Sequence, residues 1–149
     1  MVVSRGALVM KVKSYEELLV WQRAMLLAKM VYGVQKQLPK EEMYGLGDQI
    51  RRAVVSVPSN IAEGFGRESD KDFKHFLSIA RGSLYETKTQ LELAESLGYL
   101  QMPVELVDLF NEVGKLINGL SRYLATSDQR PATNDYRLTP NDQRLTTSD

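Results

Sequence analysis

Pro58 lies inside a helical pattern, within the stretch SVPSNIAEGFGR at residues 56–67. An interior proline removes a backbone donor and clashes with the preceding turn, at a cost of about 3 kcal/mol in an ordinary helix. We predict a kinked helix in which Ser56, Ser59 and Asn60 hydrogen-bond the freed backbone groups. The alternative is a bent bundle helix without further role. Apolar residues keep helical spacing through the proline: Leu46, Ile50, Ala53, Val54, Val57 and Ile61.

Apolar residues at helical spacing mark four segments of about twenty residues or more, joined by short connections. The segments are 14–37, 43–63, 70–97 and 103–124. No segment has the pattern of a strand. The sequence therefore predicts an all-α fold, an antiparallel up-down-up-down four-helix bundle with a kinked second helix. We place the bundle at residues 14–125, after a flexible N-terminal extension at 1–13.

Helix-terminal residues support these boundaries. Ser14 and Glu17 have the spacing of a capping box, and Ser69 is a candidate N-cap for the third helix. Gly98 is a candidate C-cap for the same helix. Gly82 lies in the middle of this helix, where glycine costs about 1 kcal/mol relative to alanine. We interpret Gly82 as a point of close approach between helices.

Residues 126–149 form a seven-residue repeat that reads TSDQRPA, TNDYRLT, PNDQRLT and TSD. Each unit holds at most one leucine, which is too little apolar content to repay the entropy of ordering. The sequence therefore predicts a disordered tail. A seven-nucleotide tandem repeat recurs after three frames and would encode such a peptide, so we interpret the tail as translated repeat DNA.

Composition excludes several kinds of site. The chain has no cysteine, which removes disulfides, thiolate metal sites and cysteine nucleophiles and fits a cytoplasmic protein. Its single histidine, His75, cannot supply the paired histidines of a di-iron bundle and is expected on the surface. No stretch approaches the length of a membrane span. We expect no cofactor, no metal and no membrane partner.

The first helix is apolar over a wider arc than one buried face needs. In a chain this short, such a helix is expected to share a face with another subunit. The sequence therefore predicts a homo-oligomer. One apolar stripe holds Leu18, Trp21, Met25, Ala28 and Tyr32, and a second holds Leu19, Leu26, Met30 and Val34.

Three long stretches carry a family resemblance: SYEELLVWQRAM, QIRRAVVSVPSNIAEGFGR and FLSIARGSLYETKTQLELA. They resemble the four-helix bundle family that includes proteins encoded within intervening sequences of bacterial 23S ribosomal RNA genes. The resemblance covers roughly residues 13–124. It implies a homopentamer without established enzymatic activity. Relatives that serve as accessory proteins of diversity-generating retroelements are basic pentamers that bind nucleic acid and reverse transcriptase.

The family motif implies a set of polar residues around the proline-containing helix and the third helix. We expect Arg67 to pair with Glu63 or Glu86 and to lock the two helices into one corner, so that loss of Arg67 costs a few kcal/mol. The same cluster is a candidate ligand site. Its members are Ser59, Asn60, Glu63, Arg67, Ser83 and Glu86.

Basic residues between the second and third helices form a candidate nucleic-acid surface for RNA or DNA. The whole chain has no net charge. Residues 14–125 hold thirteen Lys and Arg against fifteen Asp and Glu, a formal charge of −2, unlike the basic relatives. The candidate residues are Arg51, Arg52, Arg67, Lys71, Lys74 and Arg81.

Three classes of function remain open from the sequence. The first is an oligomeric scaffold or a nucleic-acid accessory protein. The second is a small-molecule-binding bundle that uses the polar cluster. The third is an enzyme in which Glu63 or Glu86 does acid–base chemistry, although carboxylates on bundle helices more often pair with arginine. We predict a non-enzymatic protein of the first class.

Overall fold

The computed structural model describes residues 12–126. The predicted extension and tail therefore lie outside the described residues, apart from Val12, Lys13 and Thr126. The described part of the chain is helical and holds no strand, as predicted. Its elements are η1 (Tyr15–Glu17), α2 (Leu19–Val34), η2 (Gln35–Gln37), η3 (Lys40–Glu42), α3 (Leu46–Phe65), α4 (Asp70–Ser96) and α5 (Val104–Ala125).

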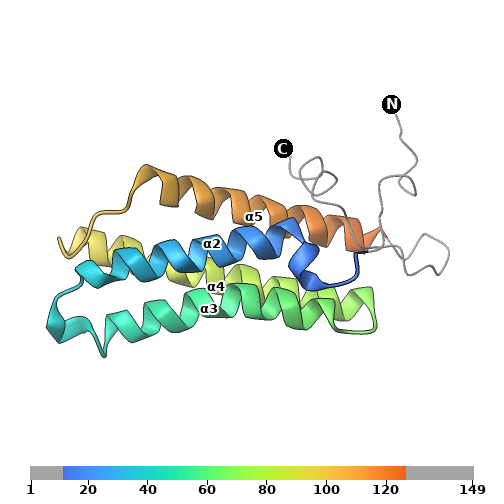
Figure 1. Cartoon of the computed structure of the whole chain (residues 1–149), viewed down its shortest axis with the longest axis horizontal. Coiled ribbons are helices and arrows are strands. Elements are labelled where there is room, and N and C mark those ends of the chain that lie inside the picture. Colours follow the sequence, from blue (N-terminus) through green and yellow to red (C-terminus); the bar gives the residue numbers. More distant parts are fainter. Residues whose placement is uncertain (1–11, 127–149) are drawn as a thin grey trace.

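The four α-helices lie side by side as an antiparallel bundle (Figure 1). Each helix packs mainly against two neighbours: α2 against α3 and α5, and α4 against α3 and α5. The α3 and α4 helices make the most extensive contact. No helix in the described part of the chain is both long and apolar enough to cross a membrane.

Pro58 is buried inside α3, which is helical on both sides of it. This confirms that the helical pattern runs through the proline, while the bend itself stays a prediction. Next to the α3 end, Gly64 brings α3 very close to α4. A Cβ atom at Gly64 would lie 2.7 Å from Phe76 Cβ and 2.9 Å from Phe73 Cδ1. Only glycine therefore fits at this crossing without a shift of α4.

The core stripe of α2 differs from the two stripes expected for the first helix. Residues at helical spacing between those two stripes are fully buried: Val20, Ala24, Leu27 and Val31. Of the expected residues, Leu18, Leu19 and Val34 are buried. The others flank the core, with Leu26 and Tyr32 exposed and Trp21, Met25, Ala28 and Met30 half-buried.

Local capping explains where α4 begins and ends. Ser69 Oγ accepts a hydrogen bond from Asp72 N at 3.1 Å, which confirms the predicted N-cap. Gly98 has a φ of 78°, and Gly98 N and Tyr99 N donate to the carbonyls of Glu95 and Ala94. This is a Schellman motif, which favours glycine at the left-handed position.

The predicted capping box at the first helix is wrong. Ser14 makes no side-chain cap, and Glu17 Oε2 accepts from Lys13 N at 3.2 Å. The chain forms the short η1 turn first, and α2 starts only at Leu19. The Ser14 and Glu17 side chains therefore lie on a separate turn and cannot cap α2.

Candidate functional site

A line of polar side chains joins α3 to α4 beside Pro58. Ser56 Oγ lies 2.8 Å from Ser83 Oγ of α4, and Asn60 Nδ2 donates to Ser56 Oγ at 2.8 Å. Thr87 Oγ1, which belongs to a fully buried residue, donates to the Ser83 carbonyl at 2.7 Å. We call Ser56, Asn60, Ser83 and Thr87 the interhelix polar network. Its hydrogen bonds lie between two closely packed helices.

Asn60 has a defined orientation in this network. Its Nδ2 also donates to the Ser56 carbonyl at 2.8 Å, and a carbonyl oxygen only accepts. The Ser56 hydroxyl accepts one Asn60 hydrogen and is therefore free to donate its own proton to Ser83 Oγ. The network thus links a backbone carbonyl, an amide and two hydroxyls, and either serine can be the donor in the Ser56–Ser83 contact.

The interhelix polar network does not make the predicted hydrogen bonds to the backbone groups that Pro58 frees. Because Pro58 has no N–H, the carbonyl of Val54 loses its helical donor. Asn60 instead bonds the carbonyl of Ser56, and the Ser56 hydroxyl turns toward α4. Ser59 is exposed on the outer side of α3. The polar residues of the motif therefore tie two helices together and leave the proline site unsupported by side chains.

Arg67 pairs with Glu63, as one of the two expected partners. Arg67 Nη2 lies 2.8 Å from Glu63 Oε1, and its guanidinium carbon lies 4.6 Å from the centre of the Phe76 ring. The two side chains are 45% and 55% exposed. An ion pair this exposed contributes little to stability, so the expected corner lock with a buried carboxylate is wrong.

The predicted polar cluster therefore does not form one site. Asn60 and Ser83 belong to the interhelix polar network, and Glu63 and Arg67 form a separate exposed pair. Glu86 is exposed on α4 and does not meet Arg67. Two network members, Ser56 and Thr87, were missing from the predicted cluster. The spacing of Thr87 four residues after Ser83 was the available signal, since a helical threonine commonly bonds the carbonyl one turn earlier.

Gly82 does not mark a close approach between the helices of this chain. A Cβ atom at Gly82 would have nothing within 4 Å, and the residue is exposed. The glycine required for close packing of α3 on α4 is Gly64. The prediction for Gly82 is therefore corrected, and this chain's own packing gives no reason for a glycine there.

The six candidate nucleic-acid residues fall into two groups. Arg51 is held by Gln35, by the Met43 carbonyl and by a salt bridge to Asp48. Such contacts fix the connection between α2 and α3 and engage the guanidinium within the chain. Arg51 is therefore better described as structural than as a free phosphate contact.

Arg81 and Arg67 are also engaged within the chain. Arg81 Nη1 donates to Asn118 Oδ1 of α5 at 3.0 Å, and Arg67 is paired as described. The other three candidates, Arg52, Lys71 and Lys74, have no ion pair to another described residue. The predicted patch is thus reduced to three cations, with Arg52 on α3 and both lysines on α4.

The residues considered from the sequence for acid–base or metal chemistry lie apart on the surface of the described part of the chain. Glu63 and Glu86 are exposed, and His75 lies on the surface with its ring 5.7 Å from that of Phe76. Within residues 12–126, no three His, Asp or Glu side chains are grouped closely enough to hold a metal ion. The specific contacts between α3 and α4 described here are the interhelix polar network and the close approach at Gly64.

Comparison with known proteins assigns the chain to a family. No curated protein matched it. A family model for the 23S rRNA-intervening sequence protein matches residues 16–119, which include all of α2, α3 and α4 and most of α5. This range covers well over half of the chain and contains the interhelix polar network. The chain therefore belongs to the 23S rRNA-intervening sequence protein family.

Proposed function

We infer that the protein is a non-enzymatic, homo-oligomeric scaffold whose subunits associate through the flanks of α2. The observation that carries this proposal is the apolar surface left on both sides of the α2 core stripe. Leu26 is 39% exposed on one side and Tyr32 is 40% exposed on the other. A helix whose apolar surface exceeds its buried stripe is typical of one that packs against a second chain.

The Leu26 flank is also hollowed. A groove of about 410 Å³ lies between α2 and α5, with Leu26, Met30 and Leu109 as its apolar lining. Glu105 and Asp108 line the same groove, together with the Arg23–Glu112 ion pair, whose closest atoms are 2.8 Å apart. An apolar centre with a charged rim is the usual composition of a protein–protein interface.

Glycines on open helix surfaces give a second argument for association, with Gly33 next to the last residue of α2 and Gly82 in the middle of α4. A Cβ atom at Gly33 or Gly82 would have nothing within 4 Å, although glycine costs about 1 kcal/mol in a helix. Glycines on an open helix surface allow the backbone of another chain to approach closely. The family resemblance makes five the leading number of subunits, and we place the assembly in the cytoplasm.

Light scattering on the full chain tests this proposal. We expect about five times the chain mass of 16.9 kDa. Leu26→Gln and Tyr32→Gln, one on each flank, are expected to lower the mass toward that of a single chain. Val104→Gln changes a residue that is 71% exposed at the start of α5 and serves as the control. A monomeric wild-type protein at micromolar concentration would reject the scaffold.

A second candidate is a nucleic-acid accessory role, which Arg52, Lys71 and Lys74 favour because they remain unpaired within the described residues. Its test is retention of RNA or DNA by wild type and by a variant with all three changed to Gln, at rising salt. Equal retention by both proteins would reject these residues as the nucleic-acid surface.

The small-molecule alternative would use the predicted polar cluster. Asn60 and Ser83 already bond within the interhelix polar network, and Arg67 already pairs with Glu63. A ligand there would have to displace these bonds. We therefore favour the scaffold over a ligand site at this cluster.

A further inference from the structure

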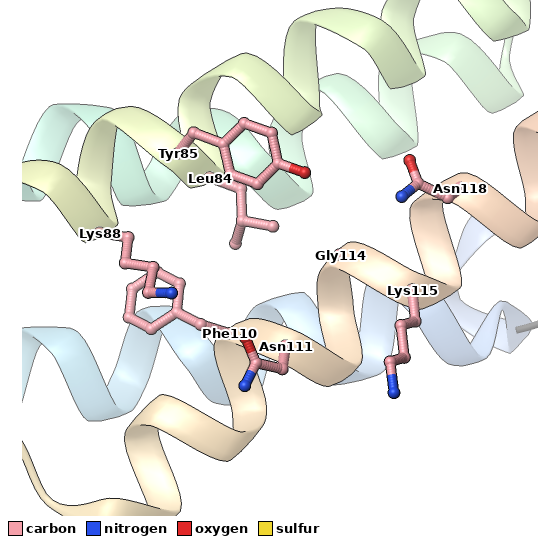
Figure 2. A pocket seen from close by; sticks show the side chains of 8 residues that line it. All are labelled: Leu84, Tyr85, Lys88, Phe110, Asn111, Gly114, Lys115 and Asn118. Carbon is pink, nitrogen blue, oxygen red and sulfur yellow. The ribbon is translucent and has the colours of Figure 1, made fainter. Parts of the chain in front are cut away.

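A hollow of about 260 Å³ lies between α4 and α5, and no member of the interhelix polar network lines it (Figure 2). Its apolar lining consists of Leu84 and Phe110, with the backbone of Gly114 beside them. A Cβ atom at Gly114 would lie 3.6 Å from Leu84 Cδ2, which is ordinary van der Waals contact. Because Gly114 has no side chain, the hollow is larger than it would be with alanine there. The packing of α5 on α4 does not itself require a glycine at this position.

The side chains around the hollow are donors of hydrogen bonds or carry positive charge. Tyr85 and Lys88 come from α4, while Asn111, Lys115 and Asn118 come from α5 (Figure 2). No carboxylate lines the hollow. It therefore differs from the α2–α5 groove, which has three acidic residues, and its charge favours an anionic ligand.

Two carboxylates adjoin the lining residues in sequence; Glu86, beside Tyr85, is exposed on α4, and the other is held by an arginine. Glu112, which follows Asn111, pairs with Arg23 of α2 at 2.8 Å. Asn118 Oδ1 accepts from Arg81 at 3.0 Å, so the Asn118 amide nitrogen is left to donate to a ligand. These two contacts engage the Glu112 carboxylate elsewhere and orient one donor at the end of the hollow.

Lys88 of α4 and Lys115 of α5 give the hollow a positive charge that suits a phosphate. Lysine is a common phosphate binder and acts there as a compact point charge. Lys88 and Lys115 together offer two positive charges, which balance the charge of a terminal phosphate. Neither lysine is in an ion pair with another described residue.

The rest of the hollow suits an aromatic ring. Tyr85 is 53% exposed, and its ring stands at the hollow beside Leu84 (Figure 2). A base can stack on such a ring whatever its sequence identity. At about 260 Å³ the hollow is just below the range of about 300–1,000 Å³ for small-molecule sites, so it suits a ligand no larger than one nucleotide. The Asn111 amide offers a donor and an acceptor, the pair that matches the N6 and N7 edge of adenine.

We propose that this hollow binds one nucleoside monophosphate unit, with the base against Tyr85 and the phosphate between Lys88 and Lys115. The unit is either a free nucleotide or one nucleotide of a single-stranded RNA, since both present the same chemistry. This site is separate from the α2 flanks and does not depend on the proposed scaffold. None of the six basic residues of the sequence-predicted patch lines it, although Arg81 donates to Asn118, which does line it.

Calorimetric titration of the full chain with AMP and with adenosine tests the site. We expect AMP to bind and adenosine to bind more weakly, because only AMP carries the phosphate. Lys88→Gln with Lys115→Gln should weaken AMP binding about tenfold or more. Lys29→Gln with Lys40→Gln removes the same charge at exposed positions of α2 and η3 and should leave AMP binding unchanged. Tyr85→Leu should weaken both ligands, because it removes the ring and keeps an apolar side chain.

An octamer of adenosine distinguishes the two sources of the nucleotide. Tighter binding of the octamer than of AMP, lost in the Lys88 and Lys115 double variant, identifies single-stranded RNA. Equal binding identifies the free nucleotide. Absence of AMP and octamer binding at millimolar AMP, or equal binding by wild type and the double variant, overturns the proposal. Light scattering on the same samples reports the scaffold separately, so either idea can fail alone.

Discussion

The Ser56 and Ser83 hydroxyl oxygens lie 2.8 Å apart and connect α3 to α4 two residues from the buried Pro58. This contact places the proline where α3 is held laterally by a neighbouring helix. A helix interrupted in its own hydrogen bonding can therefore keep its path through tertiary contacts. The contact also joins the motif in α3 to the motif in α4, through two serines that are twenty-seven residues apart in sequence.

Ser56→Ala should destabilise the fold by about 1–2 kcal/mol, because Asn60 and Ser83 each lose a hydrogen-bond partner in a partly buried place. Ser59→Ala, on the exposed side of the same helix, should change stability by less than about 0.5 kcal/mol. Urea unfolding measures both. Equal effects of the two substitutions would show that the network contributes no stability.

Gly64→Ala and Gly82→Ala should have opposite effects on the stability of the fold. The methyl group at Gly64 would meet Phe76 Cβ at 2.7 Å and should destabilise by about 1–3 kcal/mol. The methyl group at Gly82 meets nothing within 4 Å and should stabilise the chain by about 0.5–1 kcal/mol. Thermal unfolding at matched concentration provides the comparison.

The same Gly82→Ala protein also reports on assembly. If another subunit packs on this surface, the substitution should lower the mass seen by light scattering while the isolated chain becomes more stable. Unchanged mass would place the interface elsewhere on the protein.

Arg67→Ala should lower stability by no more than about 1 kcal/mol. The Glu63–Arg67 pair is half-exposed, and the contact with Phe76 is a surface cation–π interaction. Arg67→Lys keeps the charge and should lie between wild type and Arg67→Ala. If chemical denaturation showed that Arg67→Ala loses several kcal/mol of unfolding free energy, the corner lock suggested by the sequence would be supported after all.

Gly98→Ala should destabilise the end of α4 by about 1 kcal/mol, because residue 98 has a φ of 78° and an L side chain is strained there. Gly98→Asn should cost less, since asparagine tolerates this conformation better. Gly66, which has a φ of −76°, is the matched control, and Gly66→Ala should have a smaller effect. Identical losses at positions 66 and 98 would contradict this account.

Apart from the Ser14–Glu17 capping box, local rules predicted those features of the fold that depend on neighbours in sequence. The Ser69 N-cap, the Gly98 C-cap and the four helices are all determined within a few residues, and each was confirmed. The core stripe of α2 was not predicted correctly, because apolar residues lie on most sides of this helix. Periodicity alone could not choose between Leu27, which is buried, and Leu26, which is exposed.

At the candidate site, too, contacts within one helix could be predicted and contacts between helices could not. The Glu63–Arg67 pair spans one helical turn and could be predicted, whereas Ser56 with Ser83 requires the register between two helices. The roles of Gly64 and Gly82 were confused for the same reason, since both are glycines in or beside helices. Only the position of α4 shows that one faces Phe76 and the other faces open space.

The short connection between α3 and α4 has a consequence for how the chain folds. Only residues 66–69 separate the two helices, and their contact is the most extensive in the bundle. Closing so short a loop costs little entropy, so this pair should form early, before α2 and α5 arrive from the two ends of the chain. Substitutions at Ser56 and Gly64 should then slow refolding, while substitutions in the core of α2 should mainly speed unfolding.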